Sequence, residues 1–273
     1  MTNRPLILVT NDDGIHSPGL YAAAQVAAKT GDVLIAAPHT QQTGMGRSFP
    51  RCPDDGIIEK MPGRILAYAV HGSPARAVAH GVLELADRKP DLCVSGINYG
   101  ENLGTCLTCS GTLGALFEAS SHGIPGIAVS VEADLSRQHS EDFGEMDWSA
   151  AQSILERYIR QVLEEGMPGK SNPGEKQAAR ADAWNINVPA GLPFPYPERK
   201  TVLSWQNYFY FMKPEKRDYG QPYRLKSEQI VDMESLEKDS DIYALYVDRV
   251  ASVTLLNFDM SVRPCENDQV LSV

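Results

Sequence analysis

The stretch Pro5–Gly14 reads PLILVTNDDG, an apolar run that stops at two adjacent aspartates and a glycine. The apolar part is typical of a β-strand that is buried on both faces. Ser17 and Pro18 then form a helix start, an N-cap followed by proline at the first helical position, and Leu and Ala residues form a helical stripe up to Gly31. The chain therefore begins with a strand, a loop and a helix.

The same alternation of strands and helices continues through the first half of the chain. Further buried strands are predicted at residues 32–38, 91–95 and 127–131, and helices at residues 73–89, 110–122 and 151–163. This order is typical of the α/β class, and we expect a Rossmann-like three-layer domain with a mostly parallel sheet. Ligands of such sheets bind outside the carboxyl ends of the strands.

The pattern changes after residues 167–182, which are rich in Pro, Gly, Lys and Ala and predict an exposed connector. Short β-type segments follow at residues 184–188, 202–212, 242–247 and 252–258. We therefore expect an α/β catalytic domain at residues 1–190 and a β-rich C-terminal segment at residues 191–273.

The composition limits the possible partners and compartments. A hydrophobic content of 42% and a charged content of 22% indicate an ordinary globular protein. The net charge of -10 disfavours binding to long nucleic acid, which depends on Lys and Arg, so an anionic substrate would need a local cation. No apolar run is long enough to span a bilayer, and residues 1–5 lack a signal-peptide core, so we expect a cytoplasmic protein without membrane partners.

Three loops at predicted strand ends carry the residues that could bind a ligand or take part in a reaction. Asp12 and Asp13 repel each other, and a hard divalent cation such as Mg²⁺ or Mn²⁺ would explain the pair. A plain turn also explains it, since Asn, Asp and Gly all favour turns. Neutral oxygen ligands are available at Thr43 and Gly44 in the second loop and in the third loop, which begins at Ser95-Gly96-Ile97-Asn98.

The predicted helix at residues 110–122 begins with Ser110-Gly111-Thr112, where free N–H groups, the helix dipole and two hydroxyls favour a phosphate group. A simple N-cap is the alternative. The chain has no P-loop, and its glycines do not match G-x-G-x-x-G. Carboxylates, neutral oxygen ligands and an anion-binding helix start on one sheet edge together indicate metal-assisted phosphoester hydrolysis.

The stretches ILVTNDDGIHSPGL (residues 7–20), SGINYGENLG (residues 95–104) and SGT (residues 110–112) resemble the survival protein E (SurE) family. This resemblance is dense over the first 130 residues. It implies a 5'-nucleotidase that hydrolyses nucleoside 5'(3')-monophosphates to nucleoside and phosphate, with one divalent cation, Mg²⁺ or Mn²⁺, per subunit. It also implies a C-terminal arm exchanged between subunits, so we expect a homodimer or homotetramer held partly by residues 200–260.

The resemblance also assigns roles by position. The metal ligands fall on Asp12, Asp13, Thr43 and Asn98. The residues expected to bind phosphate are Asn11, Gly44, Asn102, Ser110, Gly111 and Thr112. Asp12, Asp13 and Asn102 are expected to be catalytic, the general base is left open, and Asn11 is undecided between turn geometry and phosphate contact. Thr43 stands where the family usually has serine, which keeps the hydroxyl.

Several further features have two interpretations. Cys106 and Cys109 form a lone CxxC, which is redox-active, metal-binding or simply two thiols, and we favour the thiols because no second pair has zinc-site spacing. His16 and His39 are either solvated loop residues or contacts for phosphate or a proton. The aromatic run between Trp205 and Phe211 either stacks a nucleobase or packs against another surface.

Two alternative functions are also open. The first is a phosphatase acting on non-nucleotide phosphomonoesters or short polyphosphate, since no motif identifies a base contact. The second is a non-catalytic receiver-like module, which also has an acidic pair after its first strand. The receiver would need a phosphorylatable aspartate after a later strand, where this chain has Asn98.

Overall fold

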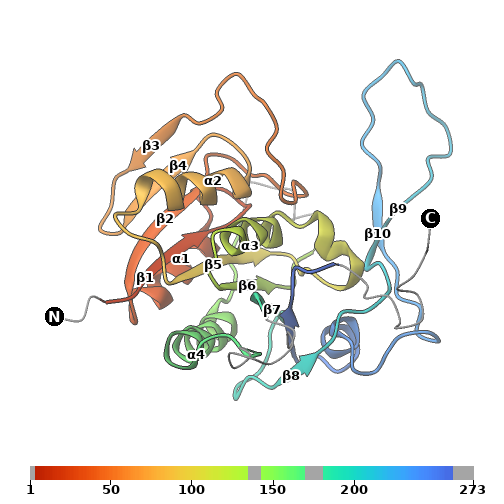
Figure 1. Ribbon diagram of the computed structural model, residues 1–273. Helices are drawn as coiled ribbons and strands as arrows, with labels where there is room; N and C mark the ends of the chain where they lie inside the picture. The colour runs from red at the N-terminus through yellow and green to blue at the C-terminus, as the bar shows by residue number, and fades with distance from the viewer. Residues whose placement is uncertain (1–3, 135–142, 170–180, 261–273) are drawn as a thin grey trace, which may run out of the picture.

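The structure, a computed structural model, describes residues 4–134, 143–169 and 181–260 (Figure 1). Its main feature is a nine-stranded sheet in the order β3-β4-β2-β1-β5-β6-β7-β11-β8. The strands of this sheet are β1 (Leu6–Thr10), β2 (Asp32–Pro38), β3 (Ile58–Met61), β4 (Leu66–Val70), β5 (Leu92–Tyr99), β6 (Gly126–Val131), β7 (Ala183–Val188), β8 (Glu198–Thr201) and β11 (Ala251–Leu256). A separate antiparallel pair consists of β9 (Phe209–Phe211) and β10 (Ser227–Gln229).

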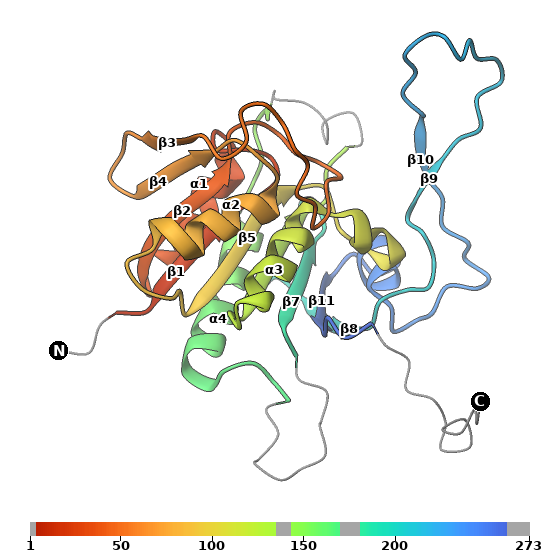
Figure 2. The ribbon, with the colours of Figure 1, turned by 45° about the horizontal axis from the view of Figure 1, so that its top comes forward.

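Helices cover both faces of the sheet. The helices α1 (Pro18–Ala27) and α4 (Ser149–Glu165) pack on one face, and α2 (Pro74–His80) and α3 (Gly111–Ser121) pack on the other (Figure 2). The central strand β1 serves both layers, because Ile7 and Val9 belong to the core beneath α1 and α4 while Leu8 belongs to the core beneath α2 and α3. The expected α/β three-layer fold with a mostly parallel sheet is confirmed.

The functional loops are brought together at β1 and β5. β1 pairs in parallel with β2 on one side and β5 on the other, with Thr10 opposite Ser95. The helix α1 leads to β2 over one face of the sheet, and α3 leads from β5 to β6 over the other. The strand order therefore reverses between β1 and β5, the place where open α/β sheets bind ligands.

One edge of the sheet differs from the sequence expectation. The strand β4 extends the parallel sheet beside β2, and β3 returns antiparallel to β4, but the sequence had predicted no strand between residues 39 and 72. The strand β5 also continues to Tyr99, beyond its predicted end at Ser95, through an irregularity in its pairing with β6 between Ser95 and Asn98. This extension places Asn98 at the carboxyl end of the central strand β5.

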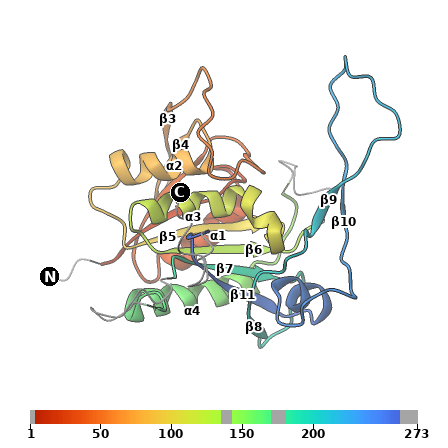
Figure 3. The same cartoon turned by 45° about the vertical axis from the view of Figure 1, so that its right-hand side comes forward.

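The C-terminal half contributes to the main sheet and to a projecting arm. β11 pairs antiparallel with β7 and parallel with β8, and the pair β9 and β10 stands away from the body in Figures 1 to 3. The predicted strand at residues 202–212 is confirmed only in part, because only Phe209–Phe211 form a strand there. The one at residues 242–247 was wrong. The segment Tyr243–Val247 is a π-helical turn, in which Leu245 packs against Leu103 and Tyr208.

Part of the predicted connector at residues 167–182 lies outside the described residues, and the boundary between residues 190 and 191 stays a prediction. No helix within the described ranges is long and apolar enough to cross a membrane.

Candidate active site

Asp12 and Asp13 lie at the carboxyl end of β1, and each is only 3% exposed. Asn11 shapes the turn that holds them. Its side-chain amide donates to the carbonyl oxygen of Gly14 at 3.0 Å, and its oxygen accepts from the backbone N–H of Gly14 at 3.3 Å. Gly14 has a φ of 97°, which side chains rarely adopt, and a Cβ there would lie 3.1 Å from Thr40. In this structure Asn11 is therefore a turn-forming residue.

The start of α3 faces Asp12. The Thr112 hydroxyl donates to Asp12 Oδ1 at 2.7 Å. Burial raises the pKa of this carboxyl, and this hydrogen bond and the backbone N–H groups of Gly111 and Thr112 offset part of the rise. A Cβ at Gly111 would lie 2.7 Å from Asp12 Oδ2, so the glycine makes this approach possible. Ser110 is the N-cap, since its hydroxyl accepts from the N–H of Leu113 at 3.2 Å. The phosphate-binding role of residues 110–112 stays a prediction.

Asp13 faces the end of β5 and the second loop. Its Oδ2 accepts from the backbone N–H of Tyr99 at 3.2 Å, and the Gln41 side chain also hydrogen bonds to it. The neighbouring Asn98 is 7% exposed, and its amide donates to the carbonyl oxygen of Gly100 at 2.6 Å. The oxygen ligands that the sequence predicts on the first and third loops therefore lie at the ends of the adjacent strands β1 and β5.

The pKa values of both buried carboxyls are raised. Burial raises the pKa of Asp12 to about 6, and burial together with the negative charge of Asp12 raises the pKa of Asp13 well above its ordinary value. No basic side chain contributes to either shift within the described part of the chain. Buried charges are normally paired or coordinate a metal, so a divalent cation with oxygen ligands fits this donor set.

The second loop is fastened on both sides of the site. The backbone N–H of Gln42 donates to the carbonyl oxygen of Asp12 at 2.7 Å, and that of Gly46 donates to Cys109 at 3.1 Å. Thr43 and Gly44 lie between these two anchors on the exposed part of the loop. Their assigned roles stay predictions. A cavity of about 290 Å³ adjoins the loop and is lined by Asp13, Gly14, His16, His39, Thr40, Gln41 and Phe143.

Asn102 is held in a network that the sequence revealed only in part. Its side-chain amide donates to the Thr112 hydroxyl at 3.3 Å and to the Ser130 hydroxyl at 3.1 Å. Its backbone N–H donates to Asn187 Oδ1 at 2.7 Å, and Asn185 donates to its carbonyl oxygen at 2.9 Å. Sequence reasoning assigned no site role to Ser130, Asn185 or Asn187, although two asparagines in a fully buried strand are a usable signal.

Comparisons with known proteins find relatives over most of the chain. A family model described as survival protein SurE matches residues 7–208. The chain belongs to the SurE family. The predicted resemblance is thereby confirmed, and the match extends well beyond the first 130 residues that carry its densest motifs.

Curated SurE relatives cover nearly the whole chain. A protein of Thermococcus kodakarensis named 5'-nucleotidase SurE is 37% identical over 261 residues, which is 94% of each chain. A protein of Methanocella arvoryzae with the same name is 36% identical over 271 residues, 95% of this chain and 94% of its own. The crystal structure of the SurE protein from Aquifex aeolicus covers 94% of this chain and 95% of its own, with a TM-score of 0.70 and 26% identity.

Two other sequence features of this SurE chain are its cysteines and its aromatic run. Cys106 and Cys109 lie in a 3-10 turn, Gly104–Cys109, immediately before α3, and both are free thiols. Cys265 lies outside the described residues. Within the aromatic run, Tyr208 is fully buried, whereas Trp205 is 87% exposed and Phe211 76% exposed. The run is therefore divided between a small core and the surface of the C-terminal segment.

Proposed function

We propose that this SurE family chain is a metal-dependent 5'-nucleotidase that hydrolyses nucleoside 5'(3')-monophosphates to nucleoside and phosphate. The observation that carries the proposal is the buried pair Asp12 and Asp13, which lies without a basic partner among the described residues at the point where the strand order reverses. The names of the curated relatives support the substrate class.

In this proposal Asp12, Asp13, Thr43 and Asn98 would hold the cation. When bound, it supplies positive charge that polarises a phosphoryl oxygen and makes a water molecule more acidic. The Thr112 hydroxyl orients the Asp12 carboxylate. The side-chain amide of Asn102 already donates hydrogen bonds to the Thr112 and Ser130 hydroxyls. It can donate to a phosphoryl oxygen only by giving up one of these two hydrogen bonds. The general base stays open between the two aspartates, because a metal-bound carboxylate is a weak base.

Removal of the cation is expected to abolish activity. Release of inorganic phosphate from AMP or GMP in the presence of Mn²⁺ or Mg²⁺ should fall to background on addition of EDTA and return when the cation is restored in excess. The reason is that two buried carboxylates would otherwise repel the phosphate dianion. Full activity in EDTA, after prior removal of bound metal, would contradict the metal role.

A substrate panel in the same assay separates the nucleotidase from its alternative. Nucleoside monophosphates should be hydrolysed faster than a sugar phosphate or tripolyphosphate. The opposite order would retain a phosphatase but replace the nucleotide by another phosphate ester as the substrate.

We also propose that the C-terminal segment joins subunits into a homodimer or homotetramer. The arm formed by β9, β10 and the residues between them exposes several large apolar side chains, and such side chains gathered on one projecting segment favour a protein–protein contact. These residues are Tyr210, Phe211, Tyr219, Tyr223 and Leu225, and the exposed Ile230 directly follows β10. Light scattering at micromolar concentration should give a multiple of 29.9 kDa. The mass of a single chain would contradict this proposal.

A further inference from the structure

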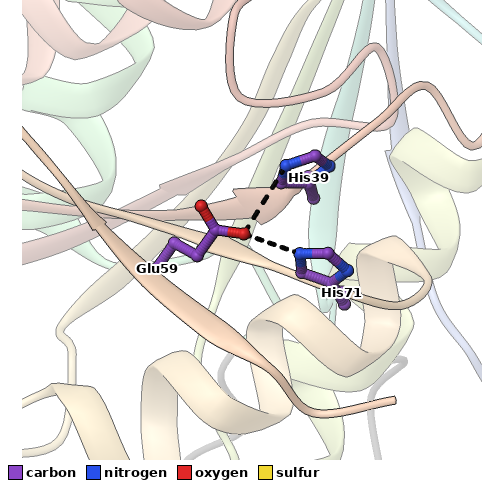
Figure 4. Close-up of side chains that lie close together, drawn as sticks. All are labelled: His39, Glu59 and His71. Carbon is purple, nitrogen blue, oxygen red and sulfur yellow. Dashed lines mark hydrogen bonds and ion pairs between the residues drawn. The ribbon is translucent and has the colours of Figure 1, made fainter. Parts of the chain in front are cut away.

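A second group of side chains of the types that bind metals lies near β3 and β4, the two edge strands that the sequence did not predict. His39 follows β2, Glu59 belongs to β3 and His71 follows β4 (Figure 4). Among the described residues it is the only group of three or more His, Cys, Asp or Glu side chains whose ligand atoms all lie within 4.8 Å of one another. It is made of different residues from the candidate active site.

The two imidazoles converge on one carboxylate oxygen. Nε2 of His71 lies 2.9 Å from Glu59 Oε1, and Nε2 of His39 lies 3.6 Å from the same atom. The two rings are 4.3 Å apart between centroids and tilted by 31°. Bonds of about 2.0–2.1 Å to a tetrahedrally coordinated metal ion place the ligand atoms roughly 3.3 Å apart. The three side chains would therefore need to move only slightly to bind such an ion.

The surrounding structure orients the group as in known zinc sites. Asp54 Oδ2 lies 2.8 Å from Nδ1 of His71, the carboxylate contact that directs the lone pair of Nε2 toward a metal. The backbone N–H of His71 donates to Ile57 at 2.9 Å, and that of His39 donates to Val70 at 2.9 Å. Two of the three ligands are therefore tied to the β3–β4 hairpin and to the neighbouring strand by main-chain bonds.

We propose that His39, Glu59 and His71 form a second metal site, selective for a transition metal such as Zn²⁺. Two imidazoles and a carboxylate are a common zinc donor set, whereas Mg²⁺ prefers oxygen ligands alone. The side chains of His39 and Glu59 are 39% and 52% exposed, so water can complete the coordination. Because His39 also lines the cavity beside Asp13 and begins the loop that carries Thr43, the bound ion would fix the first residue of that loop.

A cluster of ion pairs without metal is the competing explanation. Hydrogen bonds from His71 to Asp54 and Glu59 raise the pKa of His71, and a protonated ring would hold both carboxylates. That arrangement accounts for two contacts but does not require His39 to approach the same oxygen of Glu59. Metal binding distinguishes the two explanations directly.

The test is calorimetric titration of the full chain with Zn²⁺ in excess Mg²⁺, which occupies the oxygen-rich site. One Zn²⁺ should bind per chain, and His71→Gln or Glu59→Gln should weaken binding by at least about a hundredfold, since each removes a ligand. Asp54→Asn, which removes only the orienting contact, should weaken it by about 10–100-fold. The control His122→Gln removes another histidine that contacts a glutamate, Glu118, and should leave zinc affinity unchanged.

Imidazole nitrogen NMR of the wild-type chain provides a second measurement, in which the variants serve only to assign the resonances. Zinc should shift the Nε2 resonances of two histidines, and these should be absent from the spectra of His39→Gln and His71→Gln respectively. Equal zinc affinity in wild type, His71→Gln and Glu59→Gln would overturn the proposal, as would unshifted histidine resonances at saturating zinc. Neither readout uses phosphate release, so the result is independent of the proposed nucleotidase activity.

Discussion

Replacing Asp13 with asparagine is expected to reduce phosphate release by at least about a hundredfold, the scale of losing one preorganised electrostatic group, and to stabilise the metal-free protein. The activity falls because the cation loses one of its two charged ligands. The stability rises because a buried carboxylate beside Asp12 is removed, while the new amide oxygen still accepts from Tyr99. The gain in free energy of unfolding should be on the order of 1–3 kcal/mol at neutral pH.

Two measurements check this pair of effects. Phosphate release from AMP is compared in Mn²⁺, and denaturant unfolding is compared in EDTA. Asp87→Asn is the matched control, since this aspartate is 81% exposed and should change neither quantity. Saturating Mn²⁺ should narrow or reverse the stability difference, because it binds the wild-type site more tightly. An asparagine variant that is fully active, or less stable than wild type in EDTA, would contradict the assignment.

Replacing Gly114 with alanine is expected to destabilise the protein by about 1–3 kcal/mol, the usual cost of overpacking. A Cβ at this position of α3 would lie 2.2 Å from the backbone carbonyl carbon and oxygen of Gly46. Helix propensity alone predicts the opposite sign, because alanine is favoured over glycine by about 1 kcal/mol inside a helix. The sign of the change therefore reports whether α3 and the second loop are in direct backbone contact.

Urea unfolding of Gly114→Ala gives this sign, and phosphate release should also fall because the loop that carries Thr43 is displaced from α3. Gly191→Ala is the control. A Cβ there meets no atom within 4 Å, so only the strain of its positive φ of 66° remains, about 1 kcal/mol. An unchanged or more stable Gly114→Ala protein would show that the second loop does not pack on α3 as described.

Much of the central sheet could be predicted because its signals are local. The apolar run of β1 ends at its turn, Ser17 and Pro18 mark the start of α1, and Ser110 caps α3. The predicted strand at residues 32–38 coincides with β2. Each of these signals involves residues that are neighbours in sequence, so the chain alone carries the information.

The edges of the sheet could not be predicted in the same way. The strand β3 has only four residues, none of them fully buried, and it lacks an alternating apolar pattern, so its pairing with β4 supplies the stabilisation. The segment at residues 242–247 has the residue types of a strand, but packing of Ile242 and Leu245 against Leu103 favours a helical turn. The approach of Glu59 to His39 and His71 depends on the same unpredicted hairpin.

The sequence by itself determined the fold class, the family and the loops on which Asp12, Asp13, Asn98 and Asn102 lie. Only the tertiary structure decided what these side chains contact. Thr112 lies 100 residues from Asp12, and Tyr99 lies 86 residues from Asp13, yet each donates a hydrogen bond to its aspartate. Such contacts arise where adjacent parallel strands end together, and the energy that maintains them comes from packing of distant segments rather than from local preference.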